Sequence, residues 1–187
     1  MRVICVDLEM NQPSQKIIQI GAVCFDPYNG AIFDTFNELV NPGEQISQEI
    51  TELTGITNED VSNKSSILVA ATLLNSFKNR LNINPIGIVW GAGRSNDVRK
   101  IYEESGIESN FKDRIIDVKG IFNMLANSST SEYRSKVGLG RALEILGLGW
   151  DLKYGKQHNA LADAYNTYRL YMFLSKCLKG AVDIKLG

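Results

Sequence analysis

The stretch that most constrains this chain is residues 3–10, VICVDLEM, an apolar run that ends in two acids. Such a run predicts a short buried strand. Side chains alternate between the two faces of a strand, so Asp7 and Glu9 point the same way, roughly 7 Å apart along the chain. Two like charges beside a hydrophobic layer repel each other and lose hydration, which raises their pKa values or destabilises the fold. Hard divalent cations remove that penalty by binding carboxylate oxygens. The strand therefore predicts a metal site or several basic partners.

The rest of the chain predicts an α/β fold built on one mixed five-stranded sheet. Three apolar segments joined by short turns, residues 3–10, 16–26 and 31–40, predict an antiparallel meander. Two further strands, residues 86–90 and 114–118, alternate with helices. An antiparallel meander followed by this alternation predicts a mixed sheet flanked by helices. We expect helices at 46–53, from Thr57 or Asn58, and at 66–81, 95–105, 121–126, 139–146 and 159–178, with a polar loop at 127–135.

Length and composition predict a single domain over residues 1–187, with its core at about 3–178. A chain of 187 residues suffices for one well-cored domain but not for two comfortable ones. No apolar stretch approaches the ~20 residues of a membrane helix, and the N-terminus lacks a signal-peptide layout. Cys5, Cys24 and Cys177 lie in apolar runs without metal-ligand spacing, so we expect buried free thiols. These features predict a cytoplasmic location without membrane contact.

The formal net charge of −1 conceals an asymmetry along the sequence. Residues 1–60 carry two basic and ten acidic groups, a net −8, and residues 61–187 carry eighteen and eleven, a net +7. Such a division suits an anionic polymer bound by one part and a cation held by another. Because the whole chain is nearly neutral, we expect a local grip on such a polymer by a few basic groups, such as Arg94, Arg99, Lys153 or Lys156.

Two further acids and the one histidine of the chain stand at helix starts. Asp97 lies in the first turn of the predicted helix 95–105, where the helix dipole alone would also favour an acid. Asp163 lies on the apolar, inward face of the predicted helix 159–178, with Thr167, Leu170, Leu174 and Leu178. His158 precedes that helix by one residue and Asp163 by five. An inward acid needs a partner, which makes His158 and Asp163 candidates for a functional site.

Other catalytic patterns are incomplete in this sequence. The glycine pairs at 91–93 and 138–140 lack the third glycine of a dinucleotide-binding loop, because Asn96 and Leu143 occupy its place. The sequence contains no G-x-S-x-G, no H-E-x-x-H and no C-x-x-C pairs. These absences disfavour a Rossmann-type cofactor site, a hydrolase nucleophile elbow and a zinc site.

Together the candidates form a set of four acids and one histidine. Oxygen ligands suit Mg²⁺ or Mn²⁺ better than zinc. Four carboxylates, Asp7, Glu9, Asp97 and Asp163, could hold two such ions roughly 4 Å apart, an arrangement that stabilises the attacking and leaving oxygens of a phosphoryl displacement. His158 could accept a proton from the attacking water.

Four segments in order along the chain resemble the DnaQ-like 3′–5′ exonucleases of the DEDDh type, in the ribonuclease H-like superfamily. VDLE followed by KIIQIGAVCFD is similar to the first motif and the strand after it. ITELTGITNEDV, residues 50–61, resembles the segment that follows the third strand. VWGAGRSNDVRKIY, residues 89–102, resembles the second motif and HNALADAYNTYRLY, residues 158–171, the third. The likeness covers residues 3–174, nearly the whole chain.

The resemblance implies a metal-dependent 3′–5′ exonuclease that releases nucleoside 5′-monophosphates from single-stranded DNA or RNA 3′ ends. It implies one metal on Asp7, Glu9 and Asp163, a second on Asp7 with Asp97, and His158 as general base.

The sequence departs from the family pattern at two places. Met10 and Asn11 stand where many relatives have Thr-Gly, and Asn96 stands where an aromatic residue is common. Met10 and Arg94 are candidate contacts to substrate, although the place of Met10 on the core-facing side of the strand favours its burial. Two alternatives remain: a nucleic-acid-binding or accessory module that does not cleave, and a ribonuclease H-like endonuclease, which the His-x4-Asp spacing disfavours.

Overall fold

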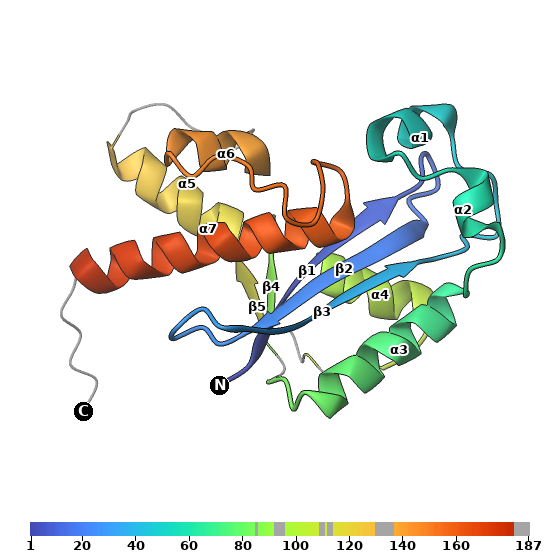
Figure 1. Ribbon diagram of the computed structural model, residues 1–187, viewed down its shortest axis with the longest axis horizontal. Coiled ribbons are helices and arrows are strands. Elements are labelled where there is room, and N and C mark those ends of the chain that lie inside the picture. The colour runs from blue at the N-terminus through green and yellow to red at the C-terminus, as the bar shows by residue number, and fades with distance from the viewer. Residues whose placement is uncertain (85, 92–95, 109–110, 112–113, 130–136, 182–187) are drawn as a thin grey trace.

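The sheet of this computed structural model contains five strands in the order β3-β2-β1-β4-β5 (Figure 1). The structure describes residues 1–84, 86–91, 96–108, 111, 114–129 and 137–181. Strands β1 (Val3–Met10), β2 (Ile17–Phe25) and β3 (Ile32–Leu39) form an antiparallel meander. Strands β4 (Gly87–Val89) and β5 (Ile115–Asp117) join it in parallel, β4 against β1 and β5 against β4. The predicted mixed five-stranded sheet is therefore confirmed.

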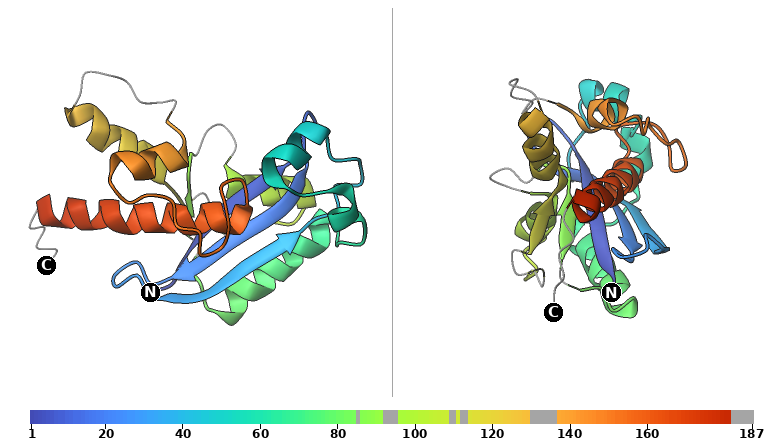
Figure 2. Two further views of the ribbon diagram at one scale, coloured as in Figure 1. Left: turned by 45° about the horizontal axis from the view of Figure 1, so that its top comes forward. Right: turned by 90° about the vertical axis from the view of Figure 1, so that its left-hand side faces the viewer.

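Helices cover both faces of this sheet (Figures 1 and 2). On one face, α3 (Ile67–Arg80) and α4 (Asp97–Ser105) pack over a cluster that contains Ile4, Val6 and Leu8 of β1. On the other face lie α5 (Val118–Ser129), α6 (Leu139–Ile145) and the long α7 (Ala160–Ala181), over a cluster that contains Val3 and Cys5. Because alternate residues of β1 enter opposite clusters, the strand reads as a continuous apolar run until its acids begin.

Two short helices, α1 (Gln48–Thr54) and α2 (Asn58–Ser62), lie beyond the carboxyl end of β1 (Figure 1). Each begins with a local cap: the Ser47 side chain accepts the N–H of Ile50, and Thr57 with Asp60 forms a capping box. The third apolar cluster lies beneath them and includes Ile18, Ile46 and Ile50. Thr57, one of the two expected caps, is therefore the N-cap of α2.

The structure corrects the sequence-based element bounds in several places. Helix α5 starts directly after β5 and runs to Ser129, so the predicted helix 121–126 is too short and residues 127–129 of the predicted polar loop are helical. The remainder of that loop lies outside the described residues. Helix α4 starts at Asp97 rather than residue 95, because the Asn96 side chain accepts the N–H of Arg99 and caps the helix. Local capping, rather than hydrophobic period, sets this boundary.

The expectation of three buried thiols is wrong for one of them. Cys5 and Cys24 are buried, whereas Cys177 is exposed. The last turns of α7 extend past the edge of the sheet (Figure 1), so the apolar pattern of the helix continues there without a surface to cover it. Leu178, predicted on the inward face, is exposed for the same reason. Within the described part of the chain, no helix combines the length and apolar character that crossing a bilayer requires.

Candidate metal centre

The carboxyl end of β1 carries the first two acids of the candidate site. Asp7 lies opposite Gly21 and Glu9 opposite Gln19 in the antiparallel pairing with β2. Directly paired residues point to the same face of a sheet, so all four share the face that α7 covers. Glu9 is 8% exposed, and Asp7 is half-buried. Both carboxylates therefore lie between the sheet and the first turn of α7.

Gly21 allows the first turn of α7 to approach β2 closely. A Cβ atom at this position would lie 2.1 Å from the carbonyl carbon of Ala160 and 2.2 Å from the amide nitrogen of Leu161. Both neighbours are backbone atoms, so no side chain could move aside. The absence of a side chain at Gly21 thus sets the distance between the sheet and the residues that precede Asp163.

Asp163, in the first turn of α7, completes a group of three carboxylates. One oxygen each from Asp7, Glu9 and Asp163 lies within 4.8 Å of the other two. The Oδ1 atom of Asp163 also accepts the backbone N–H of His158 at 3.2 Å, which links the helix start to the group. Three carboxylates at this spacing present only oxygen ligands, which suits a hard divalent cation.

Burial and mutual repulsion raise the pKa values of these acids. The pKa of Glu9 rises to about 8, first through burial and then through the charges of Asp163 and Asp97. Burial also raises the pKa of Asp7 well above its usual range, and the charges of Asp97, Asp163 and Glu9 add to the effect. The pKa of Asp163 rises to about 6 through burial, against the backbone N–H groups of His158 and Asn159, which lower it. The group is thus electrostatically strained without a cation.

Asp97 belongs to the same electrostatic environment but not to the group of three. It is the first residue of α4, and its charge raises the pKa of Asp7 and of Glu9. Burial raises its own pKa to about 7. The helix dipole favours an acid at this position, yet the neighbouring charges of Asp7 and Glu9 are also negative and repel it. An acid with such neighbours is a candidate functional group as well as a favourable first-turn residue.

His158 lies beside the carboxylates through its backbone rather than its side chain. The imidazole is exposed, and the residue has a φ of 63° in the left-handed region. Non-glycine residues in that region are uncommon and are held by their surroundings. Here the N–H of His158 donates to Asp163, and this bond fixes the residue at the entrance of α7.

The two predicted substrate contacts stand differently. Met10 is half-buried at the end of β1 and packs against the cluster beneath α3 and α4. Its side chain thus belongs to the core, which was one of the two positions expected for Met10. Arg94 lies outside the described residues. Among the other basic candidates, Arg99, Lys153 and Lys156 are exposed.

Two buried polar residues, Gln19 and Asn11, make hydrogen bonds that the sequence did not predict. The Oε1 atom of Gln19 accepts the N–H of Ala160 at 3.0 Å, and its Nε2 donates to Oδ1 of Asn37 at 2.9 Å. Asn11 donates to Glu44 and to the carbonyl of Gln45, and accepts the N–H of Ser47. Each of these residues lies within or directly after an apolar run, which indicates burial. A buried amide requires hydrogen-bond partners, so this pattern could have indicated their roles.

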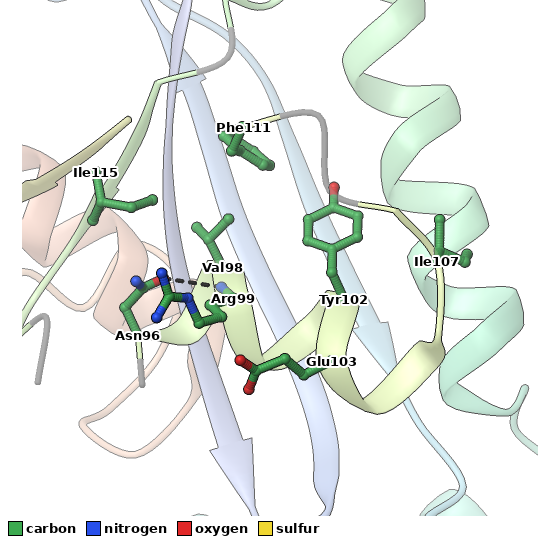
Figure 3. A pocket seen from close by; sticks show the side chains of 8 residues that line it. All are labelled: Asn96, Val98, Arg99, Tyr102, Glu103, Ile107, Phe111 and Ile115. Atoms are coloured by element: carbon green, nitrogen blue, oxygen red, sulfur yellow. Dashed lines mark hydrogen bonds between the residues drawn. The ribbon is translucent and has the colours of Figure 1, made fainter. Parts of the chain in front are cut away.

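A cavity lined in part by α4 is separate from the three grouped carboxylates (Figure 3). It has a volume of about 240 Å³, and Figure 3 shows Val98 and Tyr102 from α4 facing Phe111 and Ile115. Asn96 and Arg99 lie at one end, joined by the capping hydrogen bond. None of the three grouped carboxylates lines this cavity, so it is not the candidate metal centre.

The mixed sheet, its helical layers and the grouped acids define a ribonuclease H-like exonuclease fold. The family model described as exonuclease (RNase_T) matches residues 4–171. The chain therefore belongs to this exonuclease family, and the predicted membership in an exonuclease family is confirmed.

Individual relatives agree with this assignment. A DNA polymerase III of the PolC type from Thermotoga petrophila is 28% identical over 172 residues, which is 92% of this chain and 11% of the polymerase. The 3′-5′ exonuclease DinG of Bacillus subtilis is 40% identical over 67 residues, 34% of this chain and 7% of DinG. The chain thus spans about a tenth or less of the length of these curated relatives.

Solved structures share the fold at low sequence identity. The nuclease domain of 3′hExo, a DEDDh family member bound to rAMP, is similar with a TM-score of 0.75 and 19% identity, covering 94% of this chain and 92% of that domain. E. coli exonuclease I in complex with a dT13 oligonucleotide has a TM-score of 0.70 and 13% identity, covering 97% of this chain and 42% of the enzyme.

Proposed function

We propose that this chain hydrolyses phosphodiester bonds at single-stranded 3′ ends and releases nucleoside 5′-monophosphates, with two bound divalent cations. The observation that carries the proposal is the group of Asp7, Glu9 and Asp163, whose oxygens lie within 4.8 Å of one another. Membership of the exonuclease family supports the reaction type. The names of relatives, a 3′-5′ exonuclease and an exonuclease bound to dT13, support the polarity and the single-stranded substrate.

The acids fit a pair of hard cations in number and chemistry. Asp7, Glu9 and Asp163 would hold one ion, and Asp7 with Asp97 would hold the second. Carboxylate oxygens favour Mg²⁺ or Mn²⁺. When bound, such ions stabilise the negative charge that develops on the attacking and leaving oxygens. The raised pKa values of all four acids are consistent with this role, since like charges so arranged gain most from a cation.

The remaining chemistry belongs to the residues of the chain. His158 would accept the proton of the attacking water, because its exposed imidazole stands at the start of the helix that carries Asp163. Exposed Lys153 and Lys156, in the same loop as His158, would bind phosphates of the strand. Arg94 would assist in this contact, whereas Met10, which packs against the core cluster beneath α3 and α4, has no part in the proposal. A cytoplasmic location and a single domain over residues 1–187 are part of the same proposal.

The decisive experiment follows the products of 5′-labelled DNA and RNA oligonucleotides with Mg²⁺, Mn²⁺ or a chelator. We expect shortening from the 3′ end that requires metal and is abolished in Asp7→Asn and Asp163→Asn. His158→Ala should retain metal binding but slow hydrolysis by roughly 10² to 10⁴, the usual contribution of general acid–base catalysis. Undiminished activity in Asp7→Asn would overturn the assignment of the site.

Two outcomes would favour the alternative functions. Tight binding of the labelled strands without turnover under either metal would indicate an accessory module. Cleavage of a closed circular strand, which offers no 3′ end, would indicate an endonuclease. Equal digestion of DNA and RNA would leave the proposed reaction intact and assign it to both sugars.

A further inference from the structure

Gln19 connects three parts of the molecule that meet at the candidate metal centre. It lies on β2, is 2% exposed, and pairs directly with Glu9 of β1. Its Oε1 accepts the N–H of Ala160, the first residue of α7, and its Nε2 donates to Asn37 on β3. A single buried amide thus joins the sheet beneath Glu9 to the start of the helix that carries Asp163.

The direction of the two hydrogen bonds fixes the orientation of this amide. The N–H of Ala160 needs an acceptor, because the first N–H groups of a helix have no partner within it. Asn37 presents its side-chain oxygen to the Gln19 nitrogen, and the Gln19 oxygen is turned toward the helix. The Ala160 N–H therefore decides which end of the Gln19 amide meets α7, and the Asn37 oxygen accepts from the other end.

Gly21 and Gln19 restrict the helix in complementary ways. Gly21 sets how closely the first turn of α7 approaches β2, since any Cβ there would overlap the Ala160 backbone. Close approach alone leaves the helix free to slide along the apolar strand. The hydrogen bond from Ala160 to Gln19 fixes this position, because a buried N–H shifted from its acceptor would lose the bond without gaining water.

We propose that Gln19, anchored by Asn37, is a positioning residue that holds Asp163 and His158 in register with Asp7 and Glu9. This inference rests on the proposed exonuclease function. Asp163 is three residues beyond Ala160, and its own Oδ1 accepts the N–H of His158. A shift of the first turn therefore moves a carboxylate and the proposed base together, and misplacement of about 1 Å can cost roughly 100-fold in rate.

The test compares Gln19→Leu with a matched control, Val23→Ala. Val23 lies on the same strand and face, is fully buried, and belongs to the cluster beneath α7. Both variants weaken the packing of β2, but only Gln19→Leu removes the acceptor of the Ala160 N–H. We expect Gln19→Leu to lower kcat roughly 10- to 100-fold with KM changed far less. Val23→Ala should keep the wild-type kcat below its melting temperature.

A second readout needs neither metal nor substrate. In the metal-free protein, hydrogen exchange of the Ala160 amide should become at least about tenfold faster in Gln19→Leu than in the wild type, and remain slow in Val23→Ala. Unchanged exchange and unchanged kcat in Gln19→Leu would overturn the proposal. Equal losses of kcat in both variants would show that Gln19 serves stability alone.

The chain also offers a third signal, because His158 is its single histidine. Mn²⁺ bound at the carboxylates should broaden the imidazole resonance of the wild type, and Gln19→Leu should require more Mn²⁺ for the same broadening. A wild type that neither cleaves nor shows broadening would contradict the proposed function itself. A wild type that does both, beside an equally active Gln19→Leu, would contradict only the role of Gln19.

If Gln19→Leu does not fold, Asn37→Ala decides the question. Asn37 is exposed on β3, so its truncation leaves the core intact. Without it the Nε2 of Gln19 loses its acceptor and the side chain is held by one hydrogen bond fewer, so we expect faster exchange of the Ala160 amide together with a lower kcat. If neither the exchange rate nor kcat changes, the proposed role of Gln19 and Asn37 is wrong.

Discussion

Lys78 lies inside the molecule, between α3 and the cluster beneath it, at 1% exposure. Its ammonium nitrogen is 3.5 Å from the centroid of the Phe111 ring and 3.3 Å from the hydroxyl of Tyr102. These contacts partly replace the water that a buried ammonium loses. Burial nevertheless lowers the pKa of Lys78 to about 7. The charged form of Lys78 therefore lowers the stability of the folded state at acidic pH.

We predict that Lys78→Met raises the free energy of unfolding above that of the wild type, and that this gain is larger at pH 6 than at pH 9. Unfolded lysine binds its proton up to about pH 10.4, whereas folded Lys78 releases it near pH 7. Between these values unfolded Lys78 binds more protons than folded Lys78, so the contribution of this residue to stability rises with pH, and the variant lacks that contribution. Melting temperatures of both proteins at the two pH values measure this difference. A constant difference would contradict the lowered pKa.

At the scale of elements, the contact between β2 and the start of α7 determines the candidate site. The structure brings Ala160 directly over Gly21, and the acids of β1 and α7 meet as a consequence. The caps of α1, α2 and α4 are local by comparison, since each uses a side chain within three residues of the helix start. Local caps determine the residue at which each helix begins, while Gly21 determines how close α7 lies to the sheet.

We predict that Gly21→Ala destabilises the fold by about 2 kcal/mol or more, in the range of overpacked sites. The added Cβ would overlap backbone atoms of α7, so the helix must move away from the sheet. Gly180→Ala is the matched control, because it lies in the same helix with open space around it. That variant should gain up to about 1 kcal/mol from helix propensity. Denaturant unfolding measures both, and equal stability of the two variants would contradict the close contact.

At the scale of the whole molecule, acids from β1, α4 and α7 together make the stability of the fold depend on pH. Glu9 and Asp97 have pKa values raised to about 8 and about 7, and that of Asp163 is raised to about 6. In the folded state these groups hold protons at pH values where the unfolded chain has released them. Folding without metal is therefore linked to proton uptake.

We predict that the metal-free protein loses stability as the pH rises from about 5 to 8. For an acid with a raised folded pKa, the folded state binds more protons over this interval, so the unfolding free energy falls with pH. Saturating Mn²⁺ should remove the trend, because it binds the deprotonated acids and adds stability in the folded state. Melting temperatures with Mn²⁺ and with chelator give the comparison, with an expected gap at pH 8 of about 4 °C or more. Asp7→Asn should reduce the gap, and an equal gap in that variant would contradict the assignment.

The fold was largely predictable because its signals are local. The meander follows from apolar runs between turn residues, and the later strands and helices follow from their alternation. The errors arose where a local cap or the size of the sheet overrides the pattern. Asn96 starts α4 two residues late, and the apolar period of α7 continues to Cys177 and Leu178 after the sheet has ended.

The sequence by itself determined the strand order of the meander, the family, and the acids that became candidates, because residue type and spacing carry that information. Only the tertiary structure decided which side chains meet. It grouped Asp7, Glu9 and Asp163, placed Asp97 close enough to raise the pKa values of Asp7 and Glu9, and left the imidazole of His158 exposed. It also assigned partners to Gln19, an ordinary strand residue in the sequence. The physical reason is that these contacts join residues up to 141 positions apart, and only the packing of α7 on β2 brings them within hydrogen-bond distance.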